Sequence, residues 1–437
     1  MLAAILEGGL ARVHRGLTAT VGAALPSAWA ETNVAGSLIV AAICRRGGPV
    51  RDRRPAERPG TPAPGTGPPH ELVCPMNWSA QQDSALLAVS AWLKTRKPQV
   101  FRLFGYAGTG KTTLARHIAG DLKGEVVFGA YTGKAALVMR AKGCAEARTI
   151  HSMIYRPKDT ESEEPTFELN AESAAASASL IVIDECSMVD EELGRDLLSF
   201  GKPVLVLGDP AQLPPVKGGG YFTEAAPDVM LTEVHRQAAD NPIVRMSMIV
   251  REGGRLERGA YGESRVIARH EIDQMAVTRA DQVLVGLNRT RRLYNKRMRE
   301  LFGFTSPLPE VADKLVCLRN DRKKGLLNGG IWKVKSMSPM RRNKLRLSLV
   351  PEEDPARKPL RVGVLPAFFE SEDEIPYALR RDSDEFDYGY ALTVHKAQGS
   401  QWDDVVLFDE SGAFREHRHR WLYTGLTRAA NKLTVVV

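Results

Sequence analysis

The sequence predicts an α/β protein with two parallel sheets, each covered by helices on both faces. Short apolar runs alternate with helical stretches, both before about residue 230 and after about residue 280. Runs that are apolar throughout are typical of parallel strands buried on both faces. At 437 residues the chain is also longer than one hydrophobic core ordinarily accommodates. The predicted strands are QVFRLF (99–104), VVFGAY (126–131), LIVIDE (180–185), VLVLGD (204–209), VLVGLN (283–288), VVLFDE (405–410) and LTVVV (433–437).

Composition excludes several classes of protein. None of the five cysteines forms a CxxC pair, so neither a zinc site nor a disulfide framework is expected, and a reducing compartment fits best. No apolar run reaches the ~18 residues that a membrane span needs, so no membrane partner is expected. The formal net charge of +8 permits a polyanionic partner without identifying one.

The first 75 residues differ from the rest of the chain. Residues 45–71 consist mainly of Arg, Pro and Gly, have little to bury and are predicted to be disordered. Residues 16–31 end in a small-x-small pattern at Ala28–Ala30 that is faintly similar to a secretory signal. The other interpretation is a dispensable or spurious extension, with Met76 as the natural first residue.

An organised pattern begins after Met76. A helix is predicted in SAQQDSALLAVSAWLK, with Ser79 as its N-cap. Residues 310–369 read instead as short strands with turns, and Asn328-Gly329 is a hairpin signal, so we expect a small β-barrel-like insert. Between Arg319 and Arg346 this insert holds ten Lys/Arg and one acid, which indicates either a nucleic-acid surface or a solvated face.

A complete phosphate-binding loop follows the first predicted strand. GYAGTGKT (105–112) fits GxxxxGK[ST] between a strand and the helix TLARHIAGDL. Its backbone N–H groups and the helix N-terminus favour phosphate, Lys111 would reach the β and γ phosphates, and Thr112 would hold Mg²⁺. The predicted nucleotide-binding residues of this loop are Gly105, Ala107, Gly108, Thr109, Gly110, Lys111, Thr112 and Thr113.

Two further strands end in polar groups suited to ATP hydrolysis. Asp184 and Glu185 end LIVIDE, where Asp184 would bind the metal through water and Glu185 would orient or deprotonate the attacking water. In VLVLGDPAQLPPV (204–216), Gln212 would touch the γ-phosphate and that water, or else serve only as a turn residue in a proline-rich loop. These segments predict an ATPase that uses ATP and Mg²⁺.

The remaining motifs carry a family resemblance. TEVHRQ (232–237), YALTVHKAQGSQWDDVVLF (390–408) and YTGLTRA (423–429) resemble, in order, the later motifs of superfamily-one helicases, and most closely the B-type branch of RecD and bacteriophage Dda. The resemblance covers roughly 76–437.

The resemblance implies a specific domain arrangement. It implies a first RecA-like domain at 76–230 with a hairpin insert at 152–179, and a second RecA-like domain at 231–309 and 370–437. The second domain would hold the SH3-like insert at 310–369.

The resemblance also implies roles at the nucleotide. Gln82 resembles the glutamine that reads adenine, with Gln81 as its neighbour in an alternative register. Arg236 resembles an arginine that reaches the γ-phosphate, and Gly399 belongs to a segment that turns toward the nucleotide. Arg428 resembles the arginine finger, which would reach the nucleotide only when the cleft between the domains closes.

For nucleic acid, the resemblance implies contacts from two motifs and a strand-separating hairpin. Phe167 is the predicted wedge within 152–179, although that interval is short, which favours a translocase that unwinds poorly. The other predicted nucleic-acid-binding residues are Thr132, Gly133, Lys134, His151, Thr393, His395 and Lys396.

Taken together, the motifs predict an ATP- and Mg²⁺-dependent DNA helicase that moves 5′ to 3′ on single-stranded DNA and opens duplex junctions. Its expected location is the cytoplasm of a bacterial or phage-infected cell, with single-strand binding protein or replication and recombination proteins as candidate partners. The alternatives are an RNA-stimulated helicase and, in another class, a non-catalytic DNA-binding subunit of a recombination complex.

Overall fold

The computed structural model describes residues 78–158, 166–215, 218–233, 241–321, 323–371 and 374–437. The chain divides into two compact units, Met1–Val73 and Cys74–Val437, and all described residues belong to the second. The predicted disordered extension therefore lies outside the described residues. Within the described part of the chain, no helix is both long and apolar enough to cross a membrane.

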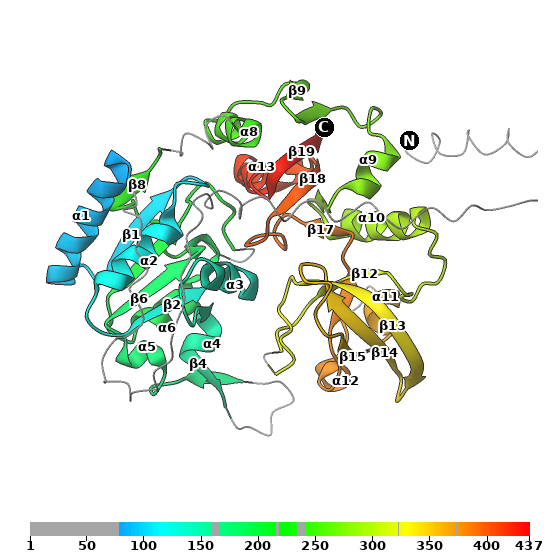
Figure 1. The fold of residues 1–437 in the computed structure, drawn as a ribbon, viewed down its shortest axis with the longest axis horizontal. Coiled ribbons are helices and arrows are strands. Elements are labelled where there is room, and N and C mark those ends of the chain that lie inside the picture. The colour runs from blue at the N-terminus through cyan, green and yellow to red at the C-terminus, as the bar shows by residue number, and fades with distance from the viewer. Residues whose placement is uncertain (1–77, 159–165, 216–217, 234–240, 322, 372–373) are drawn as a thin grey trace, which may run out of the picture. The chain divides into compact units, whose positions relative to one another are not determined.

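The first lobe, residues 78–231, is built on a six-stranded parallel sheet (Figure 1). All five pairings between its neighbouring strands are parallel. The four strands predicted before residue 230 are confirmed, and two short edge strands, β3 and β8, complete the sheet. Its order is β3 (Arg148–Thr149), β2 (Val126–Ala130), β6 (Leu180–Asp184), β7 (Val204–Gly208), β1 (Val100–Gly105) and β8 (Val229–Leu231).

Alternate strand residues bury both faces of this sheet. In β6, Leu180 and Val182 join one hydrophobic cluster, whereas Ile181 and Ile183 join another. The helices on the first face are α1 (Ala80–Thr95), α2 (Lys111–Asp121) and α3 (Gly133–Ala141). Those on the second are α4 (Ile150–Ile154), α5 (Ala174–Ser177) and α6 (Glu191–Leu198). This double burial explains the continuous apolar strands.

The second lobe has a second six-stranded sheet, in which only β9 runs antiparallel. Its order is β17 (Ala391–Thr393), β11 (Gln282–Val285), β18 (Trp402–Phe408), β19 (Ala429–Val436), β10 (Ser264–Ile267) and β9 (Gly259–Tyr261). Helices α8 (Pro242–Arg251) and α13 (Arg418–Leu426) pack on one face, and α9 (Gln274–Arg279) and α10 (Asn288–Leu301) pack on the other.

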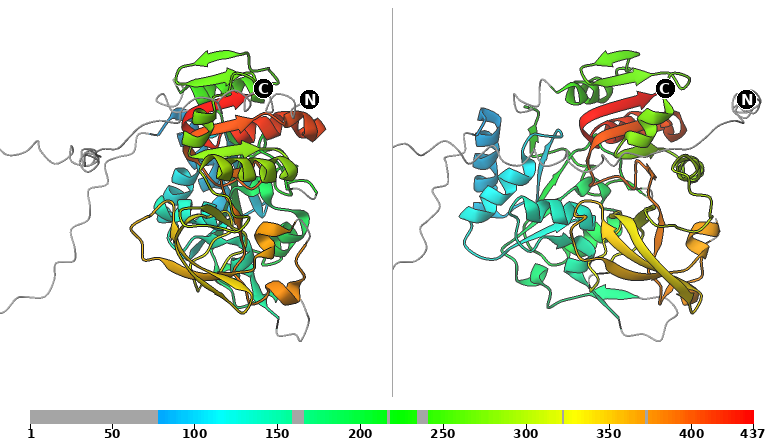
Figure 2. Two further views of the ribbon diagram at one scale, coloured as in Figure 1. Left: turned by 90° about the vertical axis from the view of Figure 1, so that its right-hand side faces the viewer. Right: turned by 45° about the vertical axis from the view of Figure 1, so that its right-hand side comes forward.

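A five-stranded antiparallel sheet, here called the insert sheet, extends from this lobe (Figure 2). Its order is β15 (Leu360–Val364), β14 (Lys344–Pro351), β13 (Ile331–Arg341), β12 (Lys314–Cys317) and β16 (Phe386–Tyr388). The fifth strand, β16, comes from beyond residue 369, the predicted end of the insert. The tight hairpin turn is Arg342-Asn343, with φ of 53° and 54°. The predicted Asn328-Gly329 signal lies instead in the longer loop between β12 and β13.

The remaining elements are short. A two-stranded hairpin within 152–179 pairs β4 (Tyr155–Pro157) with β5 (Phe167–Leu169). Helices α11 (Ala367–Glu370) and α12 (Tyr377–Arg380) precede β16, and single 3₁₀ segments occur at Cys186–Met188 and Ser411–His417.

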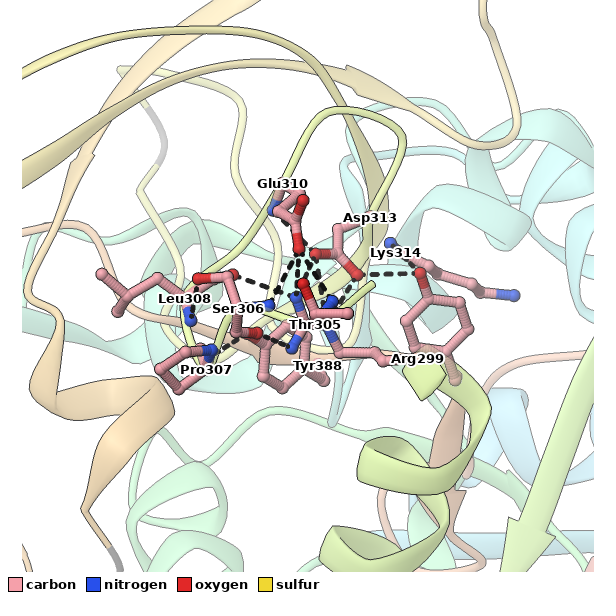
Figure 3. A network of polar contacts seen from close by, with 10 residues as sticks. Arg299, Thr305, Ser306, Pro307, Leu308, Glu310, Asp313, Lys314 and Tyr388 are labelled. Atoms are coloured by element: carbon pink, nitrogen blue, oxygen red, sulfur yellow. Dashed lines mark hydrogen bonds and ion pairs between the residues drawn. The ribbon is translucent and has the colours of Figure 1, made fainter. Parts of the chain in front are cut away.

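A buried ion pair joins helix α10 to the insert sheet (Figure 3). Arg299 Nη2 lies 3.0 Å from Asp313 Oδ2, and the Asp313 side chain has no exposed surface. The same guanidinium donates to the carbonyls of Ser306 and Leu308, and Tyr390 Oη donates to Asp313. Because each charged group has several partners, the pair fixes the loop that leads from α10 into β12.

We predict that Asp313→Ala lowers the free energy of unfolding by about 3–5 kcal/mol, because it leaves the Arg299 guanidinium buried without a carboxylate. The matched control is Glu300→Ala, which removes an exposed ion pair with Arg297 and should cost less than about 1 kcal/mol. Denaturant-induced unfolding of both variants checks the prediction, and equal unfolding midpoints would contradict it.

Candidate nucleotide site and nucleic-acid contacts

The phosphate loop joins β1 to the N-terminus of α2, as predicted. Gly108 and Gly110 both have a φ of 80°, a conformation that glycine adopts without strain. Lys111 Nζ donates to the carbonyls of Gly105 and Tyr106, at 2.8 Å each. The loop and its lysine therefore form one hydrogen-bonded unit at the helix N-terminus, where anions bind favourably.

The two acidic residues lie at the carboxyl end of β6, beside this loop. Thr112 Oγ1 donates to Asp184 Oδ2 at 2.8 Å, and the Glu185 N–H donates to Asp184 Oδ1. A hydroxyl beside a carboxylate is an oxygen donor set of the kind that Mg²⁺ prefers, so Thr112 and Asp184 fit the predicted metal.

Glu185 is held in an unusual state. Its φ of 53° places it in the left-handed region of backbone conformation. For a residue other than glycine this conformation costs free energy, and such strained residues cluster at functional sites. Burial raises the pKa of Glu185, and the neighbouring Asp184 raises it further, whereas Arg428 and Lys111 oppose the shift. A carboxylate with a raised pKa is a better proton acceptor than an ordinary glutamate.

Gln212 lies on the loop after β7, with 6% of its surface exposed. Its Oε1 has no hydrogen-bond partner within the described residues, although the side chain lines the same pocket as Lys111 and Glu185. A buried unpaired amide costs stability unless something binds it. Gln212 also closes a turn through its N–H and the Asp209 carbonyl, so both predicted roles remain open at this point.

Arg428 approaches the site from the second lobe. Arg428 is 6% exposed, and its guanidinium donates to the carbonyls of Thr424 and Ser400 and to Thr427 Oγ1. Burial lowers the pKa of Arg428, and the charge of Glu185 opposes that shift across the lobes. Both arginine and glutamate thus face one pocket.

That pocket has a volume of ≈ 240 Å³ and is shared by the two lobes. The first lobe contributes most of the predicted phosphate loop and the polar ends of β6 and β7, and the second lobe contributes Gly399, Ser400, Gln401, Thr427 and Arg428. Gly399 has a φ of 76°, and a Cβ there would lie 2.7 Å from Thr132 Oγ1 of the first lobe. Only glycine allows this approach.

Direct hydrogen bonds also join the lobes behind the pocket. Tyr423 Oη donates to Asp209 Oδ2 at 2.5 Å, and the Leu213 N–H donates to Thr424 Oγ1 at 2.9 Å. Gln398 Nε2 donates to the Leu213 carbonyl at 3.0 Å. The loop that carries Gln212 is therefore bonded to the helix that leads to Arg428.

Sequence reasoning missed Asp209, Tyr423, Thr424 and Arg251, which makes an ion pair with Asp209. Asp209 comes directly after β7, which neighbours β6 in the sheet. Polar residues at the carboxyl ends of parallel strands line the site, and this rule, which identified Asp184, could also have identified Asp209. Tyr423 and Thr424 precede Arg428 by about one helical turn. Arg251 ends an ordinary amphipathic helix and carries no signal in the sequence.

Gln82 lies at the start of α1, beside the phosphate loop. It completes a capping box with Ser79 at the start of α1, and its Nε2 donates to the Thr109 carbonyl behind the phosphate loop. The described lining of the pocket does not include it. Its neighbour Gln81 accepts from the backbone of Thr232 and Glu233. Arg236 lies outside the described residues.

The first group of predicted nucleic-acid residues faces the insert sheet. Thr132 caps α3 through the Ala135 N–H, and Gly133 is covered by Leu327. Lys134 Nζ lies 2.8 Å from Glu353 after β14 and 5.1 Å from the ring centre of Trp402. Lys134 is therefore already paired in this conformation.

The second group lies at the β4–β5 hairpin. Phe167 is 50% exposed, and its ring lies edge-on to His151 at 5.2 Å. His151 also contacts Tyr155, whose hydroxyl donates to Asp196. These residues line a cavity of ≈ 670 Å³ that reaches Asn320 of the insert. Burial lowers the pKa of His151, whereas Asp190 and Glu192 oppose that shift.

The third group follows β17. Thr393 is buried and its hydroxyl accepts from the Lys396 N–H, while His395 packs against Phe414. Burial lowers the pKa of Lys396, with a further contribution from Arg291. The three groups come from different elements, and the structure does not bring them into one pocket.

Two family models match the chain. One, described as an AAA domain, matches residues 78–271, and the other, described as a UvrD-like helicase C-terminal domain, matches residues 388–436. The first match covers the first lobe and the start of the second lobe. The second match covers β17, β18, α13 and β19 of the second lobe, together with Arg428.

Two curated proteins with similar sequences are described as DNA helicases. An ATP-dependent RecD2 DNA helicase of Deinococcus radiodurans is 28% identical over 362 residues, covering 76% of this chain and 46% of the relative. The ATP-dependent DNA helicase dda of Enterobacteria phage T4 is 32% identical over 187 residues, covering 39% of this chain and 42% of the relative. This chain thus spans less than half the length of these relatives.

Solved Pif1 helicases share the fold. Bacteroides Pif1 bound to single-stranded DNA covers 82% of this chain with a TM-score of 0.50 and 16% identity, and Pif1 of Candida albicans covers 83% with a TM-score of 0.50 and 18% identity. Together with the motifs, these comparisons point to helicases. The chain is similar to the B-type superfamily-one helicases, in the branch of RecD and Dda, and it shares its fold with Pif1.

Proposed function

We propose that this chain is an ATP-dependent DNA helicase that couples hydrolysis in the composite pocket to movement on single-stranded DNA. The observation that carries the proposal is that Glu185 of the first lobe and Arg428 of the second face the same pocket and influence each other's pKa. Relatives described as ATP-dependent DNA helicases support it.

In this proposal the phosphate loop binds the triphosphate. Lys111 exchanges the Gly105 and Tyr106 carbonyls for β- and γ-phosphate oxygens, which carry more charge and compete well for an ammonium group. Mg²⁺, held by Thr112 and by Asp184 through water, would neutralise phosphate charge. Arg236 and Gln82 are proposed to contact the γ-phosphate and the adenine, and for Gln82 this requires release from Thr109.

Hydrolysis then depends on groups from both lobes. Glu185 accepts a proton from the attacking water, and Gln212 orders that water with its free Oε1. Arg428 stabilises the charge that develops on the γ-phosphoryl oxygens. Since Arg428 belongs to the second lobe, the rate of hydrolysis depends on how closely the lobes approach, and product release would reopen the cleft.

DNA would run between the first lobe and the insert sheet. The two lysines, Lys134 and Lys396, would supply charge for phosphates. The two histidines, His151 and His395, would supply hydrogen-bond donors, and the backbone at Thr132, Gly133 and Thr393 would contact the strand. Exposed Phe167 is the proposed stacking wedge at a duplex junction. Movement 5′ to 3′ is proposed from the family resemblance alone.

A second function has one observation in its favour. Each strand of the hairpin has only three residues, Tyr155–Pro157 and Phe167–Leu169. A short hairpin separates strands less firmly, so the chain could be a translocase that unwinds poorly. The non-catalytic alternative is disfavoured because Lys111, Asp184, Glu185, Gln212 and Arg428 are all present.

The proposed function predicts ATP hydrolysis that is strongly stimulated by single-stranded DNA. Glu185→Gln should lower turnover by ~10²–10⁴-fold, the usual contribution of a general base. Glu191→Gln, an exposed glutamate on α6, is the matched control and should behave as wild type. Steady-state hydrolysis is measured with a DNA oligonucleotide, with an RNA oligonucleotide of the same sequence, and without either.

The same preparation is then tested on partial duplexes. Unwinding of a duplex with a 5′ tail, but not one with a 3′ tail, supports the proposed polarity, and hydrolysis without unwinding favours the translocase. Turnover that ignores DNA, or responds only to RNA, would refute the proposed function.

The pairing of Lys134 generates a second prediction. If Lys134 must leave Glu353 to bind a phosphate, Glu353→Gln should tighten single-stranded DNA binding by roughly two- to five-fold, the value of a partly exposed ion pair. Asp354→Asn removes the same charge one residue away and is the control. Fluorescence anisotropy at several salt concentrations measures both. An equal gain in both variants, or a gain that persists in a Lys134→Ala background, would mean that net charge alone is responsible.

A further inference from the structure

Arg251, the last residue of α8, contacts three segments of the nucleotide site. Its Nη1 lies 2.6 Å from Asp209 Oδ1 and 3.3 Å from Tyr423 Oη. Its guanidinium carbon lies 3.9 Å from the ring centre of Tyr106, within stacking distance. The side chain is only 12% exposed and that of Asp209 has no exposed surface.

Each of these three partners belongs to a segment with a proposed catalytic role. Tyr106 is part of the phosphate loop, and its carbonyl accepts from Lys111. Asp209 begins the loop that carries Gln212, and its carbonyl accepts from the Gln212 N–H. Tyr423 lies on α13, whose Thr424 carbonyl accepts from Arg428 Nε. One guanidinium thus touches the phosphate loop, the Gln212 loop and the Arg428 helix.

The charges in this cluster fix its geometry. Burial opposes the charge of Arg251, but Asp209 outweighs burial and holds the pKa of the arginine above its ordinary value. The Tyr423 hydroxyl donates to the same carboxylate, and burial raises the pKa of Tyr423 whereas the backbone of Ala107 in the phosphate loop opposes that shift. Because the buried carboxylate of Asp209 depends on Arg251 and Tyr423 as its side-chain donors, a displacement of either donor costs free energy.

We propose that Arg251 is a positioning residue, which holds the Arg428 helix and the Gln212 loop at the distance from the phosphate loop that hydrolysis requires. The proposal rests on the proposed function and deepens it, because it identifies a physical link between the phosphate loop and the arginine finger. When nucleotide moves the phosphate loop, Tyr106 and Ala107 carry that movement to Arg251 and Tyr423, and hence to Arg428.

A planar guanidinium is required for this role. It can donate along its edge to Asp209 while its face covers Tyr106, whereas the ammonium of lysine can make the ion pair but presents no plane. Arg251→Lys therefore separates positioning from charge pairing. Arg251→Met with Asp209→Asn removes both charges together, which avoids an unpaired buried carboxylate if the lysine variant fails to fold.

The test compares these variants with wild type and with Arg245→Met, an exposed arginine on the same helix. Thermal unfolding first establishes that each variant is folded. Steady-state hydrolysis gives kcat and KM for ATP, with and without an oligo(dT) strand. Binding of ADP alone and of ADP with aluminium fluoride then separates binding of product from binding of a transition-state mimic.

We expect folded Arg251→Lys to lose roughly 10²-fold in kcat, the scale of an ~1 Å misplacement, with a smaller change in KM. Affinity for ADP with aluminium fluoride should fall, as it should in Arg428→Ala, while affinity for ADP alone stays near wild type. The double substitution should show the same selective loss, and Arg245→Met should show none.

The proposal would be overturned by wild-type kcat in a folded Arg251→Lys protein or in the double variant. It would also be overturned if binding of ADP and of the aluminium fluoride complex fell equally, since that result indicates general loosening. If oligo(dT) does not change the hydrolysis rate of the wild-type protein, only the proposed function is refuted. The role of Arg251 is tested separately, by the hydrolysis rate without DNA.

Discussion

The side chain of Asp209 is fully buried at the end of β7. Arg251, which neutralises it, and Tyr423, whose hydroxyl donates to it, both come from the second lobe. Within its own lobe Asp209 also accepts from the Ala211 N–H, but a buried carboxylate that loses its charged partner is strongly destabilising, so Asp209 favours the conformation in which Arg251 is in place. The same constraint fixes the position of α13 and hence of Arg428. The position of Arg428 at the composite pocket therefore depends on how the buried carboxylate of Asp209 is paired.

The topology of the parallel sheet in the first lobe places the other residues of the site. In a parallel sheet the carboxyl ends of all strands lie at one edge. The phosphate loop after β1, the acids at the end of β6 and the Gln212 loop after β7 are therefore brought together by the sheet itself. The second sheet brings Gly399 and Arg428 to the opposite wall of the pocket. Polar residues at the edges of both sheets thus line one pocket.

Much of this could be predicted from sequence because the signals are local. Apolar strands, the Ser79 cap and the complete GxxxxGK[ST] motif each depend on a few neighbouring residues, and Thr112, Asp184 and Gln212 lie where those signals put them. Long-range partners could not be predicted. The pairing of Lys134 with Glu353, the capping role of Gln82 and the addition of β16 to the insert sheet depend on tertiary packing. Arg251 shows the limit most clearly, because its three partners come from three distant segments.

The central claim is that Arg428 of the second lobe acts directly on Glu185 of the first. The measurement that tests it is the pH dependence of single-turnover ATP hydrolysis by wild type, Arg428→Ala and Arg428→Lys. Arg428 lowers the raised pKa of Glu185, so loss of its charge should raise that pKa further. Because the carboxylate is the active form, the acid limb of Arg428→Ala should move to higher pH, while that of Arg428→Lys stays near wild type. Acid limbs that coincide in all three proteins would contradict the composite site.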